Sequence, residues 1–196
     1  MKKPLKIILA ITGASGSIYA QRIIHYLERC TNQQMSFDIV LSSNAKDVWQ
    51  HELGTDPYKS INHKIYNKDD FFAPFASGSA NYDSMIICPA SMGSIGRIAN
   101  GISDDLISRA ADVILKERKK LIIMARETPY NLIHLRNMTT LTEAGAMIIP
   151  ATPSFYSKPK TITELVDTVV VRILQAVDIE TNSYQWGNEQ PPKTSK

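Results

Sequence analysis

The chain has 196 residues, 43% of them hydrophobic and 21% charged, with a formal net charge of +3, values typical of one globular domain and not of a disordered chain. Its basic residues are dispersed, which argues against a nucleic-acid partner, and no stretch approaches the ~18 consecutive apolar residues that cross a membrane. Cys30 and Cys88 have neither metal-site nor redox spacing, so we expect a cytoplasmic protein.

The first apolar run, residues 5–11, predicts a buried β-strand that ends in a loop of glycines and hydroxyl side chains at 13–17. Gly13 and Gly16 allow backbone angles that other residues avoid, and the start of the next helix presents free amides and the positive end of a dipole. Such a loop suits a phosphate. Its Gly-x-x-Gly spacing is not the full dinucleotide fingerprint, so a phosphate site and a purely structural turn both remain open.

A helix ending near Cys30 and a second strand, residues 37–41, follow this loop. The second strand ends at Ser42 and is followed by a short helix through Trp49 and Leu53. A nicotinamide dinucleotide site would be expected to place Asp or Glu at this strand end to bind a ribose hydroxyl. The serine therefore argues against that cofactor.

The middle of the chain begins with residues 54–80, whose weak periodicity predicts a long functional loop with one weak strand at 63–66. A third buried strand, 84–88, again ends in small and hydroxyl residues, at 90–94, which open a helix.

The next predicted helix, whose apolar face runs from Leu106 to Ile114, has Asp104 and Asp105 as candidate caps. Arg109 and Lys116 lie seven residues apart and so share one stripe of this helix, two turns apart. On the residues alone, a solvated helix edge is the simpler interpretation of that stripe.

A fourth strand, residues 121–124, ends in Arg126 and Glu127. Open parallel sheets bind ligands at the carboxyl ends of their strands, so this pair is a candidate for function. Pro129 predicts the first turn of a helix through His134. The remaining predicted elements are a helical segment around 139–144, a strand at 147–149, a rigid loop at 153–159, a long amphipathic helix over 162–174 and a loosely ordered tail.

Strands that alternate with helices predict a single doubly wound, Rossmann-like α/β domain over residues 1–180, with a mainly parallel sheet flanked by helices and a tail at 181–196. In that architecture the loops at the strand ends share one crevice. Its glycines, hydroxyls, cations and acids suit a phosphorylated ligand and a proton transfer. We expect no metal site, because His25, His51, His63 and His134 lie scattered along the sequence.

Seven motifs in the same order resemble the UbiX flavin prenyltransferases, over residues 5 to 180. They lie at residues 12–17, 76–79, 88–92, 105–112, 115–118, 126–129 and 153–156. The resemblance implies a flavoprotein fold and a metal-independent enzyme that joins a dimethylallyl group from dimethylallyl monophosphate to N5 and C6 of reduced FMN. It also implies a partner UbiD-type decarboxylase that uses the prenylated flavin. Older usage named the family itself a decarboxylase of ubiquinone biosynthesis.

The resemblance also assigns roles to residues. It implies that FMN lies against Gly13, Ala14, Ser15, Ser42, Ser91, Met92, Gly93, Ser94 and Arg126. The substrate phosphate is expected near Tyr156, Arg172, Lys116 and Arg109. The positive charges of the two Arg and the Lys can stabilise a leaving phosphate without a metal. Glu127 is the expected acid and base, assisted by Ser15 and Glu52. Family members are implied to build their sites between the protomers of a dodecamer.

Three departures from the family pattern are visible, and one of them, Ser94 in place of a common Thr, keeps the hydroxyl. Phe71 stands where many relatives have Trp, which keeps an aromatic face for an allyl cation but a weaker one. Asp105 replaces a usual Asn and so changes the local charge.

Two alternatives share the fold. A flavin-dependent cysteine decarboxylase relies on a His before the third strand, and residues 64–84 contain none. A non-catalytic FMN carrier would not need Glu127 together with the cations near the expected phosphate. A plain interaction domain would leave the hydroxyls at the strand ends unexplained.

Overall fold

The computed structural model describes residues 4–30 and 34–181. Its centre is a six-stranded sheet in the order β3-β2-β1-β4-β5-β6, in which every neighbouring pair is parallel. The strand order reverses between β1 and β4, which defines a doubly wound sheet. The strands are β1 Leu5–Ile11, β2 Met35–Leu41, β3 Ile65–Asn67, β4 Ser84–Ala90, β5 Lys120–Ala125 and β6 Met147–Pro150.

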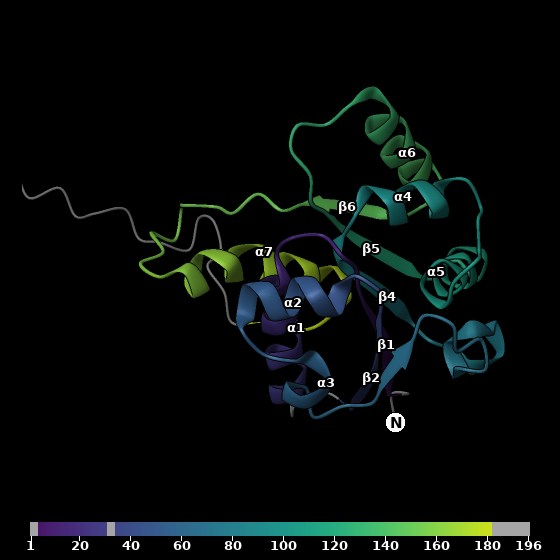
Figure 1. Cartoon of the computed structure of the whole chain (residues 1–196), viewed down its shortest axis with the longest axis horizontal. Helices are drawn as coiled ribbons and strands as arrows, with labels where there is room; N and C mark the ends of the chain where they lie inside the picture. Colours follow the sequence, from purple (N-terminus) through teal and green to yellow (C-terminus); the bar gives the residue numbers. More distant parts are fainter. Residues whose placement is uncertain (1–3, 31–33, 182–196) are drawn as a thin grey trace, which may run out of the picture.

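Helices cover both faces of this sheet (Figure 1). One face carries α1 Ser17–Arg29, α2 Ala45–Leu53 and α7 Ile162–Ala176, and the other carries α4 Met92–Ala99, α5 Leu106–Lys116 and α6 Leu132–Glu143. The shorter elements are α3 Pro57–Ser60 and the 3-10 turns η1 Pro74–Ala76 and η2 Gly78–Ala80. The predicted single α/β domain is confirmed, while its boundary at residue 180 stays a prediction.

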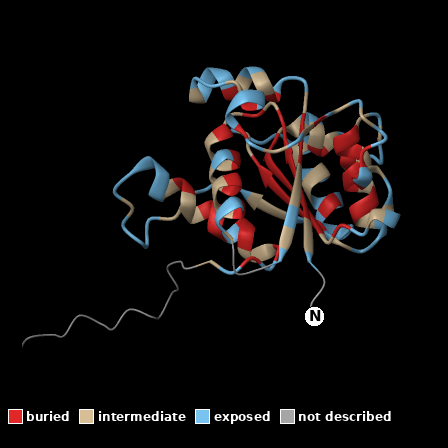
Figure 2. Ribbon diagram, turned by 90° about the horizontal axis from the view of Figure 1, so that it is seen from below, coloured by how far each residue is buried: buried red, intermediate tan, exposed pale blue. Residues whose placement is uncertain are grey.

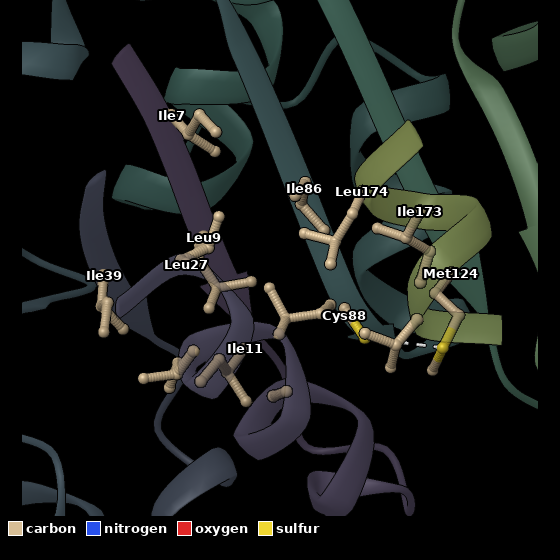
Figure 3. Close-up of a cluster of buried hydrophobic side chains, with 14 of the residues drawn as sticks. Ile7, Leu9, Ile11, Leu27, Ile39, Ile86, Cys88, Met124, Ile173 and Leu174 are labelled. Atoms are coloured by element: carbon tan, nitrogen blue, oxygen red, sulfur yellow. Dashed lines mark hydrogen bonds between the residues drawn. The ribbon is translucent and has the colours of Figure 1, made fainter. Parts of the chain in front are cut away.

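The strands read as continuous apolar runs because both faces of the sheet are buried (Figure 2). Side chains alternate across a strand, so Leu9 and Ile11 of β1 pack toward α1 and α7, while Ile8 packs against α5. Figure 3 shows the buried cluster on the face of the sheet that α1 and α7 cover, in which the Cys88 Sγ lies 3.5 Å from the Met124 Sδ. Burial raises the pKa of the Cys88 thiol, which keeps it protonated and inert.

Two predictions about local structure are wrong. Residues 54–80 are not one long loop, because they contain α3, β3 and two 3-10 turns, and β3 lies over 65–67. Pro129 does not begin a helix: α6 starts at Leu132, where the Asn131 side chain accepts a hydrogen bond from the His134 amide at 2.8 Å. This capping interaction sets the start of one continuous helix where two segments were expected.

None of the helices within residues 4–30 and 34–181 is long and apolar enough to cross a membrane. The predicted tail lies outside the described residues except for Thr181.

Candidate active site at the carboxyl edge of the sheet

Backbone hydrogen bonds tie five strand ends into one edge. Each hydrogen bond connects the residue at or just after the carboxyl end of one strand to the end of the neighbouring strand. The loops after β2, β1, β4, β5 and β6 therefore lie side by side. The four bonds run from Ser42 N to Ile11 O (2.9 Å), Thr12 N to Pro89 O (3.2 Å), Arg126 N to Ala90 O (3.3 Å) and Ala151 N to Ala125 O (3.1 Å). The predicted crevice therefore brings together the loops that carry Ser42, Gly13, Ser91 and Arg126.

Gly13 is needed for the close approach of two of these loops. A Cβ atom added at Gly13 would lie 2.6 Å from the Cβ of Asn44, in the loop between β2 and α2. Gly16, the residue before α1, has a φ of +109°, in the left-handed region that favours glycine. Glycine is therefore required at the two positions for different reasons: at Gly13 by the close approach of Asn44, and at Gly16 by the backbone conformation.

Glu52 occupies the N-terminus of α1. Its carboxylate accepts hydrogen bonds from the amides of Gly16, at 3.0 Å to each oxygen, and Ser17, at 2.7 Å. Desolvation raises the pKa of Glu52, but hydrogen bonds from Ser15, Ser17 and Gly16 outweigh it, so this pKa lies below its usual value. The anion-binding capacity expected of this loop is thus used inside the protein, and Glu52 holds the Ser15 hydroxyl in place.

The N-terminus of α4 is different. Ser91 caps it by accepting from the Ser94 amide at 3.3 Å, and the two hydroxyl oxygens lie 3.1 Å apart. No acidic residue stands in its first turn, and no described residue accepts a hydrogen bond from the amides of Met92 or Gly93. Free amides, hydroxyls and the positive end of a helix dipole make this the place in the crevice suited to a phosphate.

Thr12, which sequence reasoning missed, lies between these two loops. Its hydroxyl donates to Pro89 O at 2.7 Å and accepts from Ser91 N at 2.8 Å. The sequence shows that a polar side chain follows directly after an apolar strand, which is a signal for a functional position. It does not show the hydrogen-bond partners, because they lie 77 and 79 residues away.

Arg126 and Glu127 follow β5 directly, and both are partly buried. The Glu127 Oε1 accepts a hydrogen bond from the Thr128 amide at 3.0 Å. Neither side chain forms an ion pair with another described residue, so one cation and one carboxylate are available to a ligand at this point of the crevice.

Tyr156 and Arg172 line an open groove of about 1370 Å³ between β6 and α7. None of the described residues that the resemblance assigns to FMN lines this groove. The groove adjoins the crevice near Pro150 and Thr152, on either side of the bond from Ala151 to β5. Two of the four predicted phosphate ligands, Tyr156 and Arg172, therefore line the same groove, next to the crevice.

The structure does not bring Lys116 into the crevice of its own chain. Lys116 ends α5 only four residues before β5 begins at Lys120, whereas Glu127 follows the opposite end of β5. The Lys116 ammonium lies 2.6 Å from a carboxylate oxygen of Glu117, and its hydrogen bond lowers the pKa of that exposed carboxyl.

Arg109 and Phe71 belong to other elements of the fold than Glu127. The Nε of Arg109, in the first half of α5, donates to Ala76 O at 3.1 Å. Phe71 follows β3, at the other edge of the sheet from β5 and β6, and is 45% exposed.

Asp105 acts as the N-cap of α5. Its carboxylate accepts from the Ser108 amide at 2.8 Å, and the Ser108 hydroxyl completes a capping box. An Asn oxygen can accept the same bond, so this departure from the family pattern preserves the cap.

Within the described ranges, no three His, Cys, Asp or Glu side chains gather in a way that could hold a metal ion. His63 instead lies 3.1 Å from a carboxylate oxygen of Glu28.

Residues 1–174 match the Flavoprotein family. The protein named flavin prenyltransferase UbiX from Methanocaldococcus jannaschii is 42% identical over 186 residues, which cover 93% of this chain and 99% of that protein. The chain belongs to the UbiX flavin prenyltransferase family. The membership predicted from the seven motifs is confirmed.

Solved structures of UbiX proteins share this fold. AnUbiX (PadA1), crystallised in complex with FMN and dimethylallyl pyrophosphate, is 37% identical with a TM-score of 0.85, and the match covers 93% of this chain and 100% of that one. A dodecameric FMN-dependent UbiX-like decarboxylase from Escherichia coli O157:H7 is 34% identical with a TM-score of 0.84, covering 92% and 99%.

Proposed function

We propose that this protein transfers the dimethylallyl group of dimethylallyl monophosphate to N5 and then C6 of reduced FMN, and that a UbiD-type decarboxylase uses the product. The observation that carries the proposal is the crevice, in which a glycine loop, strand-end serines, the α4 N-terminus, Arg126 and Glu127 meet. Its weight comes from a 37% identical relative crystallised with FMN and dimethylallyl pyrophosphate.

The donors of the crevice fit a flavin mononucleotide. The amides of Met92 and Gly93 and the hydroxyls of Ser91 and Ser94 can bind its phosphate at the start of α4. Ser42 stands farther along the same edge, on the other side of the loop after β1. Arg126 supplies a positive charge beside them. The loop between β1 and α1 then contributes Gly13, Ala14 and Ser15 as a wall for the ring system. The amides at the start of α1 already donate to Glu52.

Reduced FMN bound in this crevice supplies the nucleophilic atoms N5 and C6 for the five-carbon group. As the N5 bond forms and the allylic C–O bond breaks, Glu127 takes up at its free carboxylate oxygen the proton that N5 loses and passes it to the departing phosphate. The C6 bond consumes the double bond of the five-carbon group: one of its carbons bonds to C6, and Glu127 delivers to the other carbon a proton that the loss from C6 replaces. Ser15 donates or accepts a hydrogen bond at the reacting ring, and Glu52 fixes its orientation.

The leaving phosphate is assigned to the groove between β6 and α7. Negative charge builds on its oxygen as the allylic C–O bond breaks. The Arg172 guanidinium and the Tyr156 hydroxyl, which line this groove, stabilise that charge by hydrogen bonds.

We assign Arg109, Lys116 and Phe71 to the site of a neighbouring copy in a homo-oligomer of the dodecameric type. The positions of Lys116, at the end of α5 just before β5 begins, and of Phe71, after the edge strand β3, support this assignment, as does the dodecameric relative. The neighbour's two cations then approach the phosphate, and its exposed aromatic ring faces the allyl group.

The test is anaerobic incubation of the purified protein with reduced FMN and dimethylallyl monophosphate, followed by mass spectrometry of the released flavin. We expect a flavin heavier by one five-carbon unit, and unchanged FMN when the allylic substrate is omitted. A parallel reaction with the diphosphate compares the two leaving groups. Bound but unchanged FMN with both substrates would overturn the proposal and favour a flavin carrier.

A further inference from the structure

The Thr12 side chain is one of the few buried polar groups of the described chain, with 1% of its surface exposed. Its hydroxyl makes two hydrogen bonds: it donates to Pro89 O at 2.7 Å and accepts from Ser91 N at 2.8 Å. The Thr12 amide donates to the same Pro89 carbonyl at 3.2 Å. Thr12 therefore joins the end of β1 to the turn between β4 and α4.

The partner amide belongs to the residue that caps α4. Ser91 is extended, with φ −75° and ψ 150°, and its hydroxyl accepts from the Ser94 amide at 3.3 Å. Polar contacts thus run without a break from buried Thr12, through Ser91, to the first turn of α4. Of the described side chains outside this turn, Thr12 is the one that hydrogen bonds to residues 89–91.

We propose that Thr12 is a positioning residue, whose hydroxyl orients Ser91 so that the start of α4 receives the phosphate of the flavin. The inference rests on the proposed FMN site and adds a residue that touches neither flavin nor substrate. Without the hydroxyl, Ser91 N loses its only partner in the described chain, and a buried amide left unpaired makes this turn unfavourable. The turn then shifts, and the phosphate loses aligned donors.

The test compares Thr12→Val, which keeps the shape and removes the hydroxyl, with Thr12→Ser, which keeps the hydroxyl. FMN and riboflavin, which lacks the phosphate, are titrated into each variant by flavin fluorescence. We expect Thr12→Val to weaken FMN about tenfold, the order of one buried hydrogen bond. Riboflavin affinity should hold within about threefold, and Thr12→Ser should bind FMN within about threefold of wild type, by the same relation.

Ser84→Ala is the matched control, because the Ser84 hydroxyl on neighbouring β4 is also buried but has no hydrogen-bond partner among the described residues. It should leave both affinities unchanged. If Thr12→Val does not fold, Thr12→Ala replaces it in the same titrations.

Equal weakening of FMN and riboflavin, or wild-type FMN affinity in the variant without the hydroxyl, would overturn the inference and leave Thr12 a purely structural role. Failure of this inference can be distinguished from failure of the proposed function. A wild-type protein that binds FMN but makes no prenylated flavin refutes the reaction alone, whereas one that binds no FMN refutes both.

Discussion

Glu127 is the residue whose role a single substitution tests best. Its carboxylate stands at the end of β5 without a cationic partner among the described residues, so Glu127→Gln removes a proton acceptor and little else. We expect FMN to bind normally and the single-turnover rate of prenyl transfer to fall roughly 10²-fold or more, the usual contribution of a general acid or base. Rapid-quench analysis of the flavin measures that rate.

Glu143→Gln serves as the control, because this exposed glutamate ends α6, away from the strand ends. It should turn over like wild type. An undiminished rate in Glu127→Gln would remove Glu127 from the mechanism.

The hydrogen bonds of the Glu52 carboxylate should make the stability of the protein depend on pH. The pKa of Glu52 is lowered in the folded protein, so the stabilisation is fully present above the unfolded value of about 4.3 and is lost as the pH falls through the folded value. Glu52→Gln should lower Tm at neutral pH by about 2 °C, as expected for one charge at a helix N-terminus in a domain of this size.

Thermal unfolding from pH 7 to pH 3 measures this effect. The Tm difference between wild type and Glu52→Gln should shrink as the pH falls below the usual range of the carboxyl. A difference that stays constant down to pH 3 would show that the charge of Glu52 does not hold the start of α1.

At the scale of elements, the contact between the loops after β1 and β2 depends on Gly13. Gly13→Ala places a Cβ 2.6 Å from that of Asn44 and should push the Ser42 loop away. We expect a loss of about 1–3 kcal/mol in the free energy of unfolding, typical of overpacking, and weaker FMN binding. Urea denaturation and flavin titration measure the two effects.

Asn44→Gly added to Gly13→Ala is the decisive companion, because it removes the atom that the new Cβ meets. The Asn44 side chain does not cap α2, so its removal costs no capping bond. The double variant should regain most of the lost stability and affinity. No recovery would mean that Gly13 matters for another reason.

The strands and the hydroxyl-rich loops after them could be predicted from the sequence because each depends on a few adjacent residues. Ser42, Ser91 and Arg126 follow apolar runs, and a parallel sheet places such positions along one edge. Pro129 was misleading because its preference for a first helical turn competes with the cap at Asn131, which also depends on His134.

Contacts over long sequence separations could not be predicted. Glu52 reaches Gly16 across 36 residues, and Thr12 reaches Ser91 across 79. The separation of Lys116 from Glu127 follows from the direction of α5 relative to β5, which becomes visible only in the assembled sheet.

At the scale of the whole molecule, the proposed site takes Glu127 from one chain and Lys116 from another. Lys116→Ala and Glu127→Gln should each be nearly inactive, whereas co-expression of the two chains should restore about a quarter of wild-type activity, the fraction of intact sites in random assemblies of identical interfaces. Prenylated flavin formed per site measures the recovery.

The matched pairing is Arg126→Ala with Glu127→Gln, two neighbours in one crevice, which should restore nothing. Equal activity in both mixtures would contradict a site shared between subunits and would confine the reaction to single chains.

In the proposed reaction this chain forms bonds from a five-carbon group to N5 and C6 of reduced FMN. Its most direct test is the NMR spectrum of the flavin released after anaerobic turnover with ¹³C-labelled dimethylallyl monophosphate. We expect labelled carbons bonded to both N5 and C6 of one flavin. Recovery of FMN without label, from protein that had bound it, would refute prenyl transfer by this chain.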